Sequence, residues 1–121
     1  AEPYAMVDPS VYATRLAACD VLALVFDEAG EMLTTGAAAD AVGLGLPALR
    51  SGWGYLVEHL GDAGIPVGQT AASIAVALDA LTPEALGRAA DASRVLRDDH
   101  DWSVLAERTA DLFDRTVLRQ P

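Results

Sequence analysis

One short segment of the sequence has the composition of an anion-binding helix start. It reads Thr34-Thr35-Gly36-Ala37 and is followed by a run of alanines. The first N–H groups of a helix have no partners within the helix, and the helix dipole makes them partly positive. Glycine and alanine leave such N–H groups uncovered. The segment therefore predicts a site for an anion such as a diphosphate.

An acidic residue follows one helical turn after this start. Helical spacing directs the carboxylate of Asp40 back toward the same end of the helix. There it can accept hydrogen bonds from ribose hydroxyls, as acids do in other nucleotide-binding folds. A small-residue helix beside a sheet is more often simply a tightly packed helix, and an aspartate in it a solvated residue, so both interpretations stay open.

The charge balance argues against several classes of partner. The net charge is −10, from 18 acidic residues against eight arginines, and the sequence has no lysine. A field of this sign repels nucleic acid and anionic lipid, so we expect no nucleic-acid partner. We also expect no membrane span, since no segment reaches the roughly 18 apolar residues that one needs. With a single cysteine, Cys19, expected to be buried, and no signal-peptide pattern, the sequence predicts a cytoplasmic protein.

Strand and helix signals alternate in the first half of the chain. The apolar run 20–26 predicts a parallel strand buried on both faces, and shorter strands are expected at 47–50 and 65–67. Capping residues and apolar periodicity predict helices at 11–19, 34–44, 55–60, 71–81 and 82–97, and a last one that starts at Asp101.

This order predicts one α/β domain over residues 1–121. We expect a partial doubly wound, Rossmann-like, three-layer domain with a short parallel sheet of three or four strands and a helical C-terminal tail. Ligands in such sheets bind beyond the carboxyl ends of the strands, which places the candidate site after Phe26. Half a sheet leaves an edge strand unpaired, which favours a homodimer through that edge or association with a missing half.

Other side chains each allow two interpretations. His59 and His100 lie near acidic residues, which is compatible with a metal site but more typical of a capped, solvated helix end; we expect no metal and no cofactor. Trp53 lies between two glycines, where it can stack on a sugar or base or simply pack the loop. Arg15 and Arg50 can each approach an anion, but no spacing assigns them to a site.

Five motifs occur in order between about Val11 and Val117. They are CDVLAL at 19–24, DAVGLGLPA at 40–48, LVE at 56–58, GIPV at 64–67 and an Asp-Trp-Ser helix at 101–113 that reaches an aromatic. In this order the sequence resembles the C-terminal part of retaining sugar-nucleotide glycosyltransferases of the GT-B fold (glycosyl transferases group 1 type). The resemblance implies the C-terminal half of a nucleotide-sugar-binding domain, with the first part of that domain missing.

The resemblance also implies an activity and a site. Members transfer a sugar from a nucleoside diphosphate sugar to an acceptor, so this chain resembles the donor-binding portion of a hexosyltransferase whose acceptor is unknown. The family's diphosphate-binding amides correspond to Thr35, Gly36 and Ala37, and its ribose-binding glutamate corresponds to Asp40. The residues expected to bind the donor are thus Glu31, Thr34, Thr35, Gly36, Ala37 and Asp40.

The sequence departs from the family in ways that affect activity. The first of the family's two glutamates falls on Met32, with Glu31 one place away. The cations that neutralise the donor phosphates in the family lie on earlier elements, as does the acceptor domain. We therefore expect this chain alone to be inactive and to need the N-terminal part of the same enzyme. The alternative is a noncatalytic acidic α/β protein-interaction module.

Overall fold

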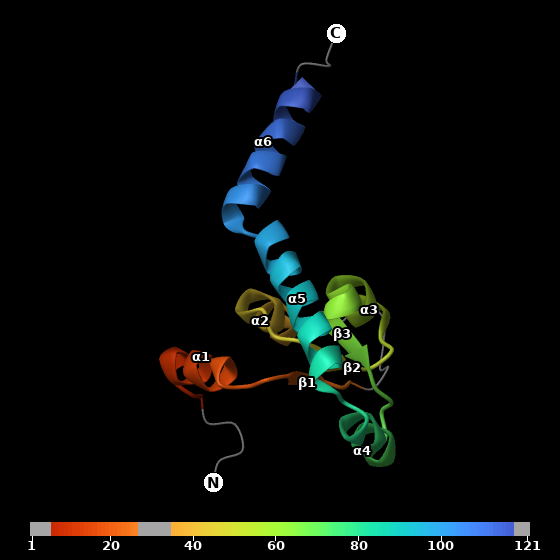
Figure 1. Cartoon of the computed structure of the whole chain (residues 1–121). Coiled ribbons are helices and arrows are strands. Elements are labelled where there is room, and N and C mark those ends of the chain that lie inside the picture. The colour runs from red at the N-terminus through yellow and green to blue at the C-terminus, as the bar shows by residue number, and fades with distance from the viewer. Residues whose placement is uncertain (1–5, 27–34, 118–121) are drawn as a thin grey trace.

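The structure is a computed structural model, and it describes residues 6–26 and 35–117. Figure 1 shows the order of the elements along the chain. The described helices are α1 (Pro9–Ala17), α2 (Gly36–Leu44), α3 (Gly54–Leu60), the 3₁₀ helix η1 (Gly61–Ala63), α4 (Ala71–Asp79), α5 (Pro83–Asp99) and α6 (Trp102–Val117). The described strands are β1 (Leu22–Leu24), β2 (Ala48–Arg50) and β3 (Gly64–Pro66).

The three strands form one parallel sheet in the order β1-β2-β3. Leu22 lies opposite Ala48, and Ala48 lies opposite Gly64. Each strand is joined to the next by a helical segment, α2 in the first connection and α3 with η1 in the second. The chain is therefore a partial Rossmann-like α/β domain with a helical C-terminal tail, and the fold prediction is confirmed with three strands.

Hydroxyl side chains begin several of the helices. Thr35 precedes α2, Thr70 forms a capping box with Ser73 at the start of α4, and Thr82 accepts a hydrogen bond from the N–H of Ala85 in α5. These contacts satisfy N–H groups that have no partner within the helix. The sequence left the cap of α2 open between Thr34 and Thr35, and the structure shows Thr35; the start predicted at Thr82 is confirmed.

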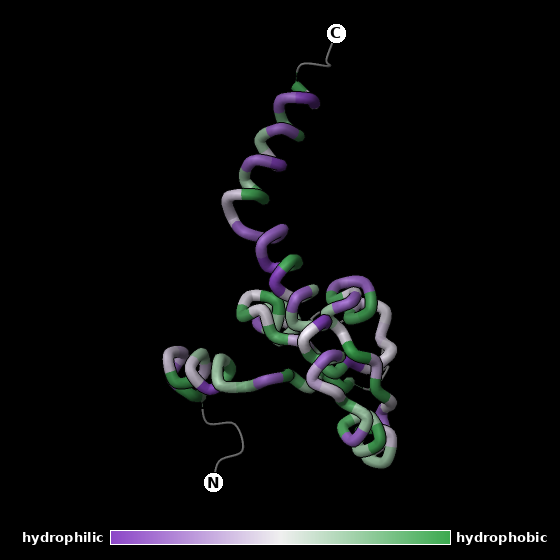
Figure 2. The backbone as a smooth tube through the Cα atoms, in the orientation of Figure 1, coloured by the Kyte–Doolittle hydropathy of each residue, from purple (hydrophilic) through white to green (hydrophobic). Residues whose placement is uncertain are grey.

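The core lies between the sheet and the helices that connect its strands. Leu24 and Ala48 pack against Ala38 and Val42 of α2 and against Leu56 and Leu60 of α3. In the colouring of Figure 2, hydrophobic segments gather in the sheet region. The expectation that the first strand is buried on both faces is wrong at Ala23, which is exposed. The physical reason is its position on the outer strand β1, where the side chain points away from the face that holds Leu24.

The helices outside this core differ in how they pack. Helix α5 packs against α2 and η1. Helices α1, α4 and α6 have no buried residue, and in Figure 1 α6 extends away from the sheet. Among the described helices, none combines the length and apolar character that crossing a membrane requires.

Candidate functional site

Helix α2 begins beyond the carboxyl end of β1. Because β1 and β2 are parallel, the chain leaves β1 at that end and returns through α2. The start of α2 therefore lies at the edge of the sheet where ligands bind in doubly wound folds. Glu31 and Thr34, two of the predicted donor-binding residues, lie outside the described residues.

The first amides of α2 are only partly engaged by the protein itself. Thr35 has extended backbone angles, and its Oγ1 accepts a hydrogen bond from the N–H of Ala37 at 3.3 Å. The N–H of Ala38 donates to the carbonyl oxygen of Thr35 at 3.2 Å. A Cβ atom added at Gly36 would meet no described atom within 4 Å. No described atom therefore fills the space beside Gly36 at the helix start. The N–H of Ala37 already donates a long hydrogen bond.

Asp40 is half-buried on α2 and contacts another helix. The hydroxyl of Tyr12, on α1, donates a hydrogen bond to Asp40 Oδ2 at 2.8 Å. This hydrogen bond raises the pKa of Tyr12, and burial and the negative charge of Asp40 raise it further. Because a carboxylate has two oxygens and several lone pairs, Asp40 can accept a bond from a ligand hydroxyl as well.

The end of β1 is joined to the segments that follow β2 and β3 through hydrogen bonds from Phe26 to Ser51 and from Gln69 to Phe26. The hydroxyl of Ser51, which is fully buried, accepts a hydrogen bond from the N–H of Phe26 at 3.3 Å. The side-chain amide of Gln69 donates to the carbonyl oxygen of Phe26 at 3.1 Å. The signal for Ser51 was its place directly after a predicted strand. Gln69 and Tyr12 had no comparable signal.

Trp53 packs into the domain. Its ring meets Phe26 edge to face at a centroid distance of 6.0 Å and Tyr55 at 5.5 Å, and it lies against the buried core. The structure thus favours the loop-packing interpretation of Trp53. The contact with Phe26 places the indole next to the end of β1.

The two histidines make different contacts, although both line one cavity. The ring of His59 stacks on Tyr55 at 5.3 Å, and His100 Nδ1 lies 2.8 Å from the carbonyl oxygen of Leu96. Asp101 accepts a hydrogen bond from the N–H of Ser103 at 2.9 Å at the start of α6, as expected for a helix cap, and its hydrogen bonds to Ser103 lower its pKa. The described residues contain no group of three or more His, Cys, Asp or Glu side chains placed to bind a metal.

Comparisons with models of protein families, with curated proteins and with solved structures found no match for this chain.

Proposed function

We propose that this chain is the donor-binding portion of a glycosyltransferase and holds a nucleoside diphosphate sugar at the start of α2. The observation on which the proposal depends is the placement of Gly36 and Ala37. They begin a helix beyond the carboxyl end of a parallel strand, and the space around Gly36 is open among the described residues. Backbone amides in this position favour binding of a diphosphate.

In this proposal Asp40 holds the ribose of the donor. It lies on α2 one turn after the diphosphate amides, and its hydrogen bond with Tyr12 fixes the carboxylate relative to α1. Glu31 and Thr34, which precede α2 in the sequence, are the other proposed donor-binding residues. The transfer itself needs further groups, because sites that stabilise a leaving phosphate normally include a cation. We therefore propose that the N-terminal part of the same enzyme, or a second copy of the chain, pairs with the outer edge of β1.

The binding step can be tested on the chain as it stands. The ¹H–¹⁵N NMR spectrum is followed during titration with UDP, GDP, ADP and dTDP, each compared with the matching nucleoside. Saturable shifts at Gly36, Ala37 and Asp40 with one diphosphate, absent with its nucleoside, would support the proposal. Gly36→Val places a branched side chain in the open space and should weaken binding, whereas Gly43→Ala on the same helix should not. Absence of shifts at Gly36 and Ala37 with all four diphosphates would refute it.

A second candidate function is supported by α6. This helix exposes large apolar side chains, namely Trp102 (86% exposed), Leu112 (65%), Phe113 (65%) and Val117 (69%). Several exposed large apolar residues on one helix are typical of protein-binding surfaces. A noncatalytic module that associates through α6 should form concentration-dependent oligomers or complexes that Phe113→Glu abolishes. The sedimentation coefficient can be compared between the unaltered chain and Phe113→Glu. If it is the same in both and does not change with concentration, self-association through α6 is contradicted.

A further inference from the structure

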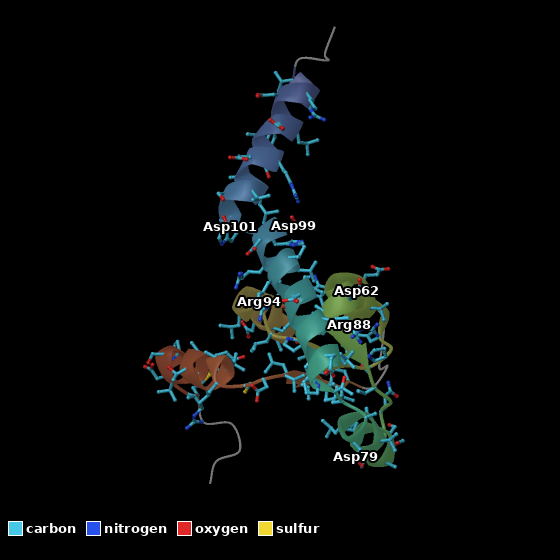
Figure 3. All side chains as sticks on the ribbon, viewed as in Figure 1. Asp62, Asp79, Arg88, Arg94, Asp99 and Asp101 are labelled. Atoms are coloured by element: carbon cyan, nitrogen blue, oxygen red, sulfur yellow. The ribbon has the colours of Figure 1, made fainter. Side chains whose placement is uncertain are left out.

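A cavity with two arginines lies away from the start of α2. It has a volume of about 570 Å³ and lies between the ends of β2 and β3, η1 and the first half of α5. Arg50, at the end of β2, and Arg88, on α5, are its cations, and Asp62 of η1 is its acid. Figure 3 labels Arg88 and Asp62 on the neighbouring elements α5 and η1. The described members of the proposed donor site, Thr35, Gly36, Ala37 and Asp40, do not line this cavity.

Packing, rather than an ion pair, holds the side chain of Arg50. Its Nε and Cδ atoms lie 2.6 and 2.7 Å from where a Cβ atom of residue 64 would be, so only glycine at that position leaves room for them. Nε is shielded from solvent and has no acceptor among the described residues, and Nη1 reaches the carbonyl oxygen of Ser51 only at 3.5 Å. The side chain of Arg50 thus lies against Gly64, and no carboxylate among the described residues forms an ion pair with its guanidinium.

The other charges near Arg50 do not neutralise it. Within the described residues, Arg94, Arg97, Arg108 and Arg115 each lie within 4.0 Å of an aspartate, whereas Arg50 and Arg88 form no such pair. Asp62 is exposed and is not within ion-pair distance of either arginine. Two unpaired arginines facing one cavity are unexpected in a protein whose net charge is −10.

We propose that this cavity binds a phosphate group, and that Arg50 and Arg88 are the residues that recognise it. Two guanidinium groups match the charge of a phosphate dianion and can donate several hydrogen bonds to its oxygens. A monovalent carboxylate would leave one of the two charges unmatched, so phosphate is the preferred ligand. Small side chains on α5, at Ala85, Ala89 and Ala92, leave the space open for the rest of a phosphorylated compound.

The test is an NMR titration of the full chain with inorganic phosphate at constant ionic strength, with acetate as the comparison anion. Saturable shifts of the Gly64 and Ile65 amides with phosphate would support the proposal. Binding of acetate, followed at the same amides, should be at least tenfold weaker. Arg50→Gln and Arg88→Gln should each weaken phosphate binding about tenfold or more, as expected for loss of a charge-assisted contact. Asp62→Asn should strengthen it by removing a like charge.

The matched control is Arg15→Gln, which makes the same change in net charge on α1, outside the cavity lining. This variant should bind phosphate as the unaltered chain does. Because Arg88 is exposed, Arg88→Gln should fold normally even if a change at Arg50 disturbs the sheet. Absence of saturable shifts at Gly64, equal affinity for acetate, or unchanged binding in Arg88→Gln would each overturn the proposal. None of these outcomes bears on diphosphate binding at Gly36, which is read from different amides.

Discussion

The hydroxyl of Tyr12 lies 2.8 Å from Oδ2 of Asp40, although the two residues are 28 positions apart in the sequence. This hydrogen bond joins α1, which has no buried residue, to α2, whose start is the proposed diphosphate site. A ribose hydroxyl that binds Asp40 must share the carboxylate with Tyr12. Donor binding and the position of α1 should therefore be coupled.

The hydrogen bond between Tyr12 and Asp40 predicts a response to high pH. Only the neutral phenol donates the bond, so the contact is present at neutral pH and is lost as the pH rises through the raised pKa of Tyr12, above the ordinary value of 10.0. Asp40→Asn removes the charge that disfavours the tyrosinate, so it should lower this pKa. NMR titration of the Tyr12 ring carbon measures both values. An identical midpoint in the two proteins would contradict the contact.

The cap of α6 predicts a response to low pH. Hydrogen bonds from Ser103 lower the pKa of Asp101, so the cap stabilises α6 above the ordinary value of 3.8 and this contribution is lost as the pH falls through the lowered pKa. Asp101→Asn keeps a capping side chain but removes the titration. The Ser103 amide shift should therefore follow a carboxylate titration in the unaltered chain and lose it in the variant. A matching acid transition in both proteins would show that another group is responsible.

Two glycines at the end of α2 should respond in opposite directions to alanine. Gly45 has a φ of +66°, and a Cβ there would lie 3.1 Å from Cγ of Arg94, so Gly45→Ala should destabilise the fold by about 1–2 kcal/mol. Gly43 lies within the helix with open space around it, and Gly43→Ala should stabilise by roughly 0.5–1 kcal/mol. Urea unfolding measures both free energies. Equal effects of the two substitutions would contradict the left-handed cap at Gly45.

The two neighbouring aliphatic residues Leu56 and Val57 on α3 should differ strongly in their contribution to stability. Leu56 is fully buried in the core, so Leu56→Ala should cost roughly 2–5 kcal/mol and leave little folded protein. Val57 is 39% exposed, and Val57→Ala should cost under about 1 kcal/mol. Thermal unfolding followed by circular dichroism compares them. A larger loss at Val57 would show that α3 packs with a different face toward the sheet.

Residues close together in the sequence predicted the helix starts. The lengths of the strands depended on pairing between distant segments. Thr82 and Asp101 cap their helices as predicted, and Thr35 is one of the two caps considered for α2, since a cap depends only on residues within one turn. The first strand was predicted over 20–26 but pairs only over Leu22–Leu24, because its partner β2 has only three residues. Residues Gly61–Ala63, which lie between the predicted helix at 55–60 and the predicted strand at 65–67, form the 3₁₀ helix η1. Cys19 is half-buried rather than part of the core.

The candidate site was less predictable than the helices. Composition indicated the amides at Gly36 and Ala37, because their lack of large side chains is visible in the sequence itself. Two other hydrogen bonds, on α2 and after β1, join distant positions: Tyr12 with Asp40, and Gln69 with Phe26. Such pairs depend on how the elements pack, and a single sequence does not specify that packing.

The edge-to-face contact between Phe26 and Trp53 makes Trp53 an intrinsic fluorescent probe of this region. The indole contacts Phe26, just after β1, so a ligand that binds beside this residue should alter the emission of Trp53. Trp102, the other indole, is 86% exposed, and a phenylalanine in its place would leave Trp53 as the sole fluorophore of this type. Binding of the proposed nucleotide ligand can then be timed in a stopped-flow instrument without attaching a dye.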